Sequence, residues 1–266
     1  MKVLVTVKEV AEAADDFELA EGALDIDERY LEYDLNEWDE YAVEEGVRIA
    51  EDDEDTEVVS VTIGPERSEE TIRMALAKGV DRAIRVWDDA LEETAFLDVE
   101  ARAAILEAVV SEEEPDLVLT GVQAADDGFG ATGVALADAI SFEWAAVVND
   151  LDLDLENDLA HVHRELEGGI EELTDVSLPA VLSIQTGINE PRYASLRGIR
   201  QAQSKEIAPY GLDDLGLDAE TTESTLSLTS MYEPETESDA TVFEGSPEEE
   251  ADQLAELFGE MGVVEG

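Results

Sequence analysis

Apolar residues in the first 150 positions follow two alternating patterns. Short runs rich in Val, Ile and Leu are separated by longer segments in which apolar side chains recur every three or four residues. The predicted strands are Lys2–Val7, Glu57–Ile63, Arg82–Val86, Leu117–Thr120 and Trp144–Val148, and the predicted helices are Glu40–Glu51, Ser68–Ala77, Thr94–Ser111 and Ala131–Ile140. Helical crossovers between parallel strands are right-handed and cover both faces of the sheet. We therefore expect an α/β fold with a doubly wound, mostly parallel sheet.

The pattern changes after about residue 150, where polar and apolar positions alternate with period two. Asp150–Leu155 and His161–Leu166 show this alternation, and Gly168-Gly169 precedes a third short run, Ile170–Val176. This order predicts a small antiparallel hairpin excursion from the sheet. Leu178–Ile184 is apolar and β-rich, which predicts a return to a buried strand.

Residues 221–266 are rich in Ser, Thr, Asp and Glu and contain one amphipathic segment, Glu248–Phe258. We expect this segment to be a terminal helix at the end of an extended acidic arm. An arm with one helix cannot bury much surface by itself, so it is either disordered or wrapped around a partner, and we favour the partner. The predicted organisation is an α/β domain over residues 1–220 followed by this C-terminal arm.

The charge of the chain narrows the classes of partner. The 266 residues include 70 Asp and Glu against 15 Lys and Arg, a formal net charge of −55, which repels nucleic acid and anionic membrane surfaces. The acidic residues occur in almost every segment, and Arg outnumbers Lys 11 to 4. This distribution is typical of a halophilic protein, because the screening length is only ~3 Å at 1 M salt. An acidic tail or solvated helix faces in an ordinary cytosol are the alternative.

The residue types exclude several kinds of site. Cysteine is absent, which excludes disulfides, thiolate metal sites and Cys nucleophiles. His161 and His163 are the whole histidine supply and lie two apart in an alternating run, which favours a solvent-facing pair over a metal or catalytic pair. The N-terminal apolar run is too short for a signal peptide, and no stretch approaches ~20 apolar residues. We therefore expect a soluble, cytoplasmic protein that is not embedded in a membrane.

A glycine-rich loop after the fourth predicted strand is the strongest candidate binding site. Ligands of an open parallel sheet bind beyond the carboxyl ends of its strands, and Gly121–Gly133 follows such an end and opens a predicted helix. Its glycines let backbone N–H groups face inward, and the helix N-terminus adds about half a positive charge, which together make an anion cradle. A tight turn with a glycine cap is the simpler alternative, but it does not explain so long a glycine- and acid-rich loop. We therefore predict a site for a nucleotide phosphate.

Other nucleotide and catalytic motifs are weak or absent. Gly128, Gly130 and Gly133 match G-x-G-x-x-G, but they follow the fourth strand rather than the first, which disfavours a standard NAD fingerprint. The sequence contains no P-loop motif and no G-x-S-x-G nucleophile elbow. It thus predicts a nucleotide site without an obvious catalytic apparatus.

A second unusual segment, Asn189–Tyr193, lies between the last buried strand and the helical stretch Ala194–Gln203. Its Asn and Pro make a simple turn one interpretation. The other is that Ile188, Arg192 and Tyr193 are presented together as a docking surface, because Arg and Tyr are favoured in protein contacts. The residues alone leave both interpretations open.

Together these segments resemble the small, or beta, subunit of electron-transfer flavoproteins over about residues 1–220, with a looser likeness in the arm. Several separate motifs occur in the family's order, which makes the match specific. They are Val3–Lys8, Leu35–Glu45, Thr62–Pro65, Glu70–Arg73, Ala75–Arg82, Gly121–Gly133, Arg164–Gly169, Leu178–Val181, Asn189–Tyr193 and Ala194–Leu196. The resemblance implies a Rossmann-like, adenine-nucleotide-binding sheet.

The resemblance also implies cofactors and partners. In the family, this subunit forms a heterodimer with a larger alpha subunit, which makes most contacts to the redox-active FAD. The beta subunit buries a structural AMP or, in the bifurcating branch, a second FAD. The heterodimer would be an electron carrier rather than an enzyme. It would accept electrons from acyl-CoA and related dehydrogenases and deliver them to a membrane quinone oxidoreductase.

Two sets of residues are carried over from the family by position. The AMP site would consist of Thr6, Asn36, Glu37, Trp38, Asp39, Ile63, Gly121, Val122, Gln123, Ala124, Ala125, Asp126, Asp127, Gly128, Phe129, Gly130, Ala131 and Thr132. The dehydrogenase-recognition loop, within about residues 184–203, would use Ile188, Asn189, Glu190, Pro191, Arg192 and Tyr193, with Ile188 where the family commonly has leucine.

Departures from the family pattern keep alternatives open. Glu9–Asp15 contains no aromatic residue, although members often carry one there, near the alpha-subunit flavin. The loop lacks the glutamine usual just before Thr132, whereas Thr132 itself resembles the AMP-binding branch, since bifurcating members often have valine there. The alternatives to the ordinary carrier are a bifurcating carrier with a second FAD and a stand-alone adenine-nucleotide-binding protein.

Overall fold

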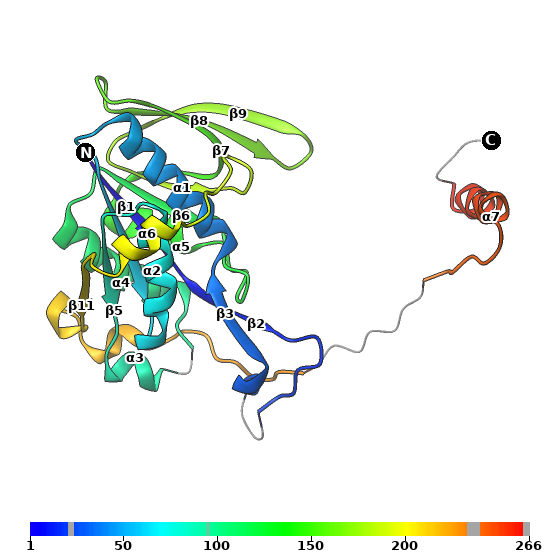
Figure 1. Ribbon diagram of the computed structural model, residues 1–266, viewed down its shortest axis with the longest axis horizontal. Helices are drawn as coiled ribbons and strands as arrows, with labels where there is room; N and C mark the ends of the chain where they lie inside the picture. The colour runs from blue at the N-terminus through cyan, green and yellow to red at the C-terminus, as the bar shows by residue number, and fades with distance from the viewer. Residues whose placement is uncertain (21–23, 95, 233–239, 263–266) are drawn as a thin grey trace. The chain divides into compact units, whose positions relative to one another are not determined.

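The computed structural model describes residues 1–20, 24–94, 96–232 and 240–262, and the chain divides into two units, Met1–Met231 and Tyr232–Gly266. In the described part of the first unit, nine strands form one sheet in the order β11-β5-β4-β1-β6-β10-β7-β8-β9 (Figure 1). Neighbouring strands are parallel from β11 to β7 and antiparallel from β7 to β9. The predicted fold class, a mostly parallel α/β sheet with an antiparallel excursion, is confirmed.

The elements have the following bounds. The strands of the large sheet are β1 (Lys2–Thr6), β4 (Glu57–Ile63), β5 (Arg82–Val86), β6 (Leu117–Gly121), β7 (Glu143–Asp154), β8 (Leu159–Leu166), β9 (Ile170–Ser177), β10 (Ala180–Ile184) and β11 (Ile207–Tyr210). A separate antiparallel pair is formed by β2 (Glu9–Ala13) and β3 (Leu31–Leu35). The helices are α1 (Glu37–Asp52), α2 (Glu69–Lys78), α3 (Asp89–Glu93), α4 (Val99–Glu113), α5 (Thr132–Ile140), α6 (Leu196–Ala202) and α7 (Pro247–Glu260). Short 3-10 turns lie at Glu28–Tyr30, Glu66–Ser68, Asp213–Leu215 and Ala219–Thr222.

Alternation of side chains along the strands builds a core on each face of the sheet. In β1, Val3 and Val5 belong to one buried cluster and Leu4 to the other. The first cluster receives apolar side chains from α1, α2 and α6, and the second receives those of α4 and α5. The helices therefore lie on both faces, and the carboxyl ends of β1 and β6 meet side by side at one edge.

The two runs predicted at Trp144–Val148 and Asp150–Leu155 are one continuous strand, β7. Its first half pairs parallel with β10 and its second half antiparallel with β8, and both ladders shift register around Val148. Val147 has a φ of 63°, which is rare for a β-branched residue, so the shift is a bulge that redirects the strand. The sequence pattern changes here because the strand changes its pairing partner.

Some elements differ from the prediction. The helix predicted from Thr94 begins at Val99, because the Asp98 side chain accepts a hydrogen bond from the Ala101 amide at 3.0 Å and caps it; residue 95 lies outside the described residues. The sequence pattern did not predict the β2–β3 pair, α3 or the edge strand β11. β11 contains Pro209, which a sheet edge tolerates but which weakens a strand signal.

In the described residues of the second unit, α7 contains the predicted segment Glu248–Phe258. Ser246 and Glu249 form a capping box, in which the Ser246 amide donates to Glu249 Oε2 at 2.9 Å and the Glu249 amide donates to Ser246 Oγ at 3.4 Å. None of its residues is buried. The domain boundary near residue 220 and the wrapping of the arm around a partner stay predictions.

Candidate nucleotide-binding site

A pocket lies at the carboxyl ends of β1 and β6. From β1 the sheet extends through β4 in one direction and through β6 in the other, so this crevice is a topological switch point, where open α/β sheets bind ligands. Twelve of the eighteen predicted AMP-site residues line it: Thr6, Asn36, Asp39, Ile63, Gly121, Val122, Gln123, Ala124, Asp127, Gly130, Ala131 and Thr132.

The other six predicted residues lie beside the pocket and not in its wall: Glu37, Trp38, Ala125, Asp126, Gly128 and Phe129. Two of them support the wall. Trp38 donates its indole N–H to Gln185 Oε1 at 3.3 Å, and Asp126 forms an ion pair with Lys8. Whether each of the six side chains faces the pocket depends on the turn of α1 and on the path of the loop, and spacing along the chain reveals neither.

The pocket is also lined by residues that were not predicted: Val7, Lys8, Val61, Leu97, Arg102, Leu106 and Thr120. Lys8 Nζ lies 2.9 Å and Arg102 Nη1 2.6 Å from the same Asp127 oxygen. Burial raises the pKa of Asp127, but hydrogen bonding and charge from Lys8 outweigh it and lower that pKa. Lys8 stands directly after the first strand, which was a usable signal, whereas nothing in the sequence placed Arg102 there.

Two side chains at the start of α1 fix the glycine-rich loop. Asn36 Nδ2 donates to the Gln123 carbonyl at 2.9 Å, and its Oδ1 accepts from the Ala125 amide at 3.3 Å. Asp39 accepts from the amides of Lys8 and Gly121, at 2.8 and 3.1 Å, and thereby joins the ends of β1 and β6. Asp39 is only 4% exposed, and burial raises its pKa to about 7. A Cβ on Gly121 would overlap Asp39 Oδ1, so this junction requires glycine.

The N-terminus of α5 supplies free donors to the pocket. Ala131 makes no side-chain cap, and the first helix amide with an acceptor is that of Ala135, bonded to the Ala131 carbonyl at 2.9 Å. In the described chain, the amides of Thr132, Gly133 and Val134 therefore have no acceptor. Gly128 and Gly130, with φ of 63° and 60°, let the preceding loop turn toward them. Free amides and the helix dipole suit a phosphate, and Ile63, Val61 and Leu106 add apolar wall for a base.

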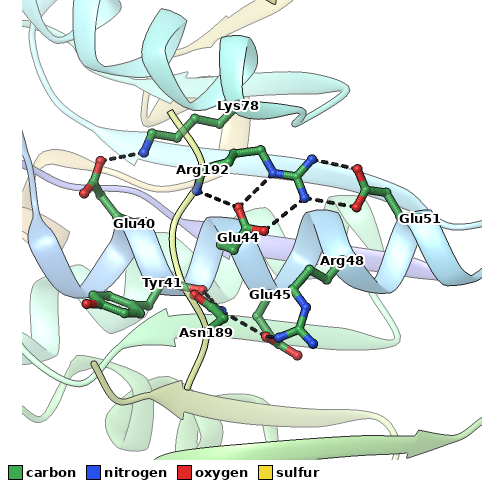
Figure 2. A network of polar contacts seen from close by, with 9 residues as sticks. All are labelled: Glu40, Tyr41, Glu44, Glu45, Arg48, Glu51, Lys78, Asn189 and Arg192. Carbon is green, nitrogen blue, oxygen red and sulfur yellow. Dashed lines mark hydrogen bonds and ion pairs between the residues drawn. The ribbon is translucent and has the colours of Figure 1, made fainter. Parts of the chain in front are cut away.

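Two of the predicted recognition residues, Asn189 and Arg192, lie along α1 and contact its side chains (Figure 2). Asn189 Nδ2 donates to the Tyr41 carbonyl at 3.1 Å and to Glu45 Oε2 at 2.9 Å. The Arg192 guanidinium contacts two carboxylates, with Nε 2.8 Å from Glu44 and Nη1 2.6 Å from Glu51. The hydrogen bond from Arg192 lowers the pKa of Glu51. This end of the segment is therefore fixed to three turns of one helix.

Exposure differs sharply among the recognition residues. Ile188 is half-buried and packs against the core, and Asn189, Pro191 and Arg192 are also half-buried. Tyr193 is 98% exposed, and Glu190 is exposed as well. Of the three side chains expected to be presented together, only Tyr193 projects fully into solvent. The docking role of the segment stays a prediction.

The described residues show neither a metal centre nor a membrane-spanning helix. There, no group of three His, Asp or Glu side chains is arranged to hold a metal ion. No helix in that part of the chain is long and apolar enough to cross a membrane. His161 contacts Asp175 at 2.6 Å, and this hydrogen bond raises the pKa of the histidine.

Comparisons with known proteins give one consistent result. A family model described as electron transfer flavoprotein domain matches residues 23–215. The chain is 44% identical over 265 residues to the electron transfer flavoprotein subunit beta of Methylophilus methylotrophus, covering 98% of this chain and 99% of that protein. The corresponding subunit of Bos taurus is 36% identical over 234 residues, which cover 88% of this chain and 89% of that protein. The subunit of Bacillus subtilis is 31% identical over 259 residues, which cover 97% of each chain.

Proposed function

The chain belongs to the electron transfer flavoprotein family, among its beta subunits, and we propose that it works with an alpha subunit as a heterodimeric electron carrier in the cytoplasm. The carrier accepts electrons from primary dehydrogenases, such as acyl-CoA dehydrogenases, and passes them toward the quinone pool through a quinone oxidoreductase. The observation that supports this most is the match to beta subunits along nearly the full length of both chains. FAD, shared with the alpha subunit, supplies the electron-accepting chemistry when bound.

In this proposal the pocket between β1 and β6 holds AMP. The amides of Thr132, Gly133 and Val134 would hold its phosphate, since they have no acceptor in the described chain. Ile63 and Leu106 would pack against its base. The pocket wall comes from β1, α1, the loop after β6 and α5, so a bound nucleotide stabilises the contact between four separate segments. Its role is structural, and this chain moves no proton for it.

Cofactor content tests the proposal directly. The chain is purified in high salt with its alpha subunit, bound cofactors are released with acid, and FAD and AMP are quantified by chromatography. We expect one FAD and one AMP per heterodimer. Two FAD and no AMP would replace the ordinary carrier with a bifurcating one, and no flavin would replace it with a stand-alone nucleotide-binding protein.

A second measurement tests the direction of electron flow. The heterodimer is mixed with a reduced acyl-CoA dehydrogenase from the same organism, and reduction of the heterodimer's flavin is followed by absorbance. We expect reduction at a rate that saturates with dehydrogenase. If the heterodimer has the expected cofactor content but is not reduced, the nucleotide assignment stands and the assigned electron donor is wrong.

A further inference from the structure

One carboxylate joins three separate parts of the pocket wall. Asp127, in the glycine-rich loop, holds Lys8 at 2.9 Å and Arg102 at 2.6 Å through the same oxygen, Oδ2. Lys8 follows β1 and Arg102 lies in the first turn of α4, so the three side chains come from different elements of the fold. Asp126 forms a second ion pair with Lys8. We call Lys8, Arg102, Asp126 and Asp127 the wall cluster.

The wall cluster is electrically neutral, because it contains two cations and two carboxylates. Among the described residues that line the pocket, Lys8 and Arg102 are the only cations. Although burial raises the pKa of the Asp127 carboxyl, hydrogen bonding and charge from Lys8 lower it below its ordinary value, so the carboxylate is ionised at neutral pH. The Asp127 side chain is 11% exposed and that of Arg102 is 16% exposed, so water screens their ion pair little. Both cations of the pocket are thus paired by the chain itself.

The pocket provides free donors for one phosphate group. The amides of Thr132, Gly133 and Val134 have no acceptor in the described chain and lie together at the start of α5. One phosphate group can accept from all three, and the helix dipole stabilises its charge. A second phosphate, as in a nucleoside diphosphate or in the pyrophosphate of a dinucleotide, adds negative charge that needs cations of its own. In this wall, Asp127 already holds those cations.

We propose that Asp127 makes the pocket selective for a nucleoside monophosphate, because it occupies Lys8 and Arg102 and presents its own negative charge to a second phosphate. The amides of α5 supply affinity, and the wall cluster supplies selectivity by leaving an additional charge unpaired. FAD carries a pyrophosphate and makes the same demand, so the wall cluster disfavours the second FAD of a bifurcating carrier. The inference rests on the proposed function, since it concerns the nucleotide of the same site.

The substitution Asp127→Asn separates the charge of this side chain from the shape of the loop. Asp127 Oδ1 accepts a hydrogen bond from the Phe129 amide at 3.1 Å, and asparagine keeps an oxygen for this bond. The asparagine Nδ2 is a donor and cannot hold Lys8 or Arg102. The Arg102 guanidinium makes no other hydrogen bond or ion pair in the described chain, so the variant frees it for a ligand.

Glu113, at the other end of α4, offers a matched control. One arginine and one lysine hold its carboxylate as well, Arg82 at 2.5 Å and Lys2 at 3.1 Å, and its side chain is 10% exposed. Glu113 does not line the pocket. Glu113→Gln therefore removes the same kinds of ion pair from the same helix without changing the charge of the pocket wall.

The test uses the complete heterodimer in high salt, with AMP and ADP as the probes. Each protein is incubated with both nucleotides at equal concentration until the bound composition is constant. After gel filtration, the nucleotides are released with acid and quantified by chromatography. We expect wild type to bind AMP over ADP by at least about tenfold, and D127N to lower this ratio about tenfold. R102Q/D127N should restore most of the ratio, because Lys8 is still paired with Asp126, and E113Q should leave it within about twofold.

Several outcomes would overturn the inference. An unchanged ratio in D127N, or a wild type that binds ADP as well as AMP, would refute it and leave the nucleotide site intact. A D127N heterodimer that binds neither nucleotide, although circular dichroism and gel filtration show a folded complex, would mean that Asp127 holds the loop and does not select the ligand. An equal change in E113Q would show that the ratio follows stability and not the charge of the pocket. A wild-type heterodimer that binds no adenine nucleotide would remove the proposed site, and this inference with it.

Discussion

The wall of the nucleotide pocket and helix α6 each contain two cationic side chains, but only one pair is neutralised. In the pocket, Lys8 and Arg102 are both held by Asp127, and Lys8 also by Asp126. On α6, Arg197 and Arg200 have no carboxylate partner among the described residues. Because carboxylates are so abundant in this chain, an arginine without an ion-pair partner says more about its surroundings than a paired arginine does.

The comparison also separates two ways of attracting an anion. The pocket offers backbone amides at the start of α5. The fold sets the direction of these amides, and a side-chain substitution nearby does not change their number. Helix α6 offers side-chain charge, which salt screens and substitution removes. Nucleotide binding should therefore depend on backbone shape, and docking should depend on charge.

The largest expected effect comes from removing salt, which acts on both regions at once. In ~10 mM buffer the screening length is roughly 30 Å, so repulsion among 70 carboxylates returns across the whole molecule. We expect the first unit to unfold or to lose its partner on dialysis, measured by circular dichroism and gel filtration. Full stability in that buffer would contradict the halophilic interpretation and leave the other predictions standing.

Gly121→Ala should break the pocket and spare α6. The added Cβ overlaps Asp39 Oδ1 and lies 2.7 Å from Trp38 Cβ, which forces the ends of β1 and β6 apart. We expect loss of AMP from the heterodimer and a decrease in unfolding free energy of about 1–3 kcal/mol. Gly259→Ala, where a Cβ meets nothing within 4 Å, is the matched control. Retention of AMP in the Gly121 variant would mean that the nucleotide lies elsewhere.

The buried carboxyl of Asp39 predicts a pH dependence for the pocket alone. Because burial raises its pKa to about 7, above the ordinary value of 3.8, the folded state binds more protons than the unfolded state between these values. The stability that this group contributes is present below about pH 4 and is lost as the pH rises toward 7. We expect the unfolding free energy of wild type relative to Asp39→Asn to fall by about 2 kcal/mol between pH 5 and 8 in high salt. A difference that is flat with pH would show that Asp39 is ionised throughout.

Arg192→Gln should have the smallest effect on stability among these changes. It should also separate most clearly the role of the recognition segment from that of the nucleotide pocket. It leaves Glu44, whose side chain is 8% exposed, without its guanidinium partner, and we expect a loss of about 1–2 kcal/mol by chemical denaturation. AMP content should be unchanged, whereas the KM for electron transfer from the dehydrogenase should rise, because Tyr193 is no longer fixed. Arg48→Gln is a suitable control, since Arg48 is half exposed and pairs with Glu45 on the same helix. Equal effects of the two variants on the KM would argue against a positioning role for Arg192.

The pocket could be predicted from the chain because its parts are local. Gly121–Gly133 follows a buried strand directly, and strand ends in a parallel sheet meet at one edge, so a ligand site at that edge could be predicted from the pattern. Thr6, which lines the same pocket, was added by the family resemblance. Arg102 could not be predicted, because its contact with Asp127 depends on how α4 packs across the sheet. The burial of Ile188 could not be predicted either, because its half-buried position results from packing of its segment on the core.

The amino-acid sequence by itself determined most of the strand and helix order, the glycine-rich loop, the family and the surplus of acid, because these depend on residue type and spacing along the chain. Only the tertiary structure decided which charges are neutralised. Arg192 meets Glu44 across 148 positions, and Lys8 meets Asp127 across 119. Ion pairing falls off within a few ångströms, so it is set by which segments pack together and not by their separation in sequence. Arg197 and Arg200 have no ion-pair partner among the described residues for the same reason: packing brings no carboxylate of that part of the chain to them.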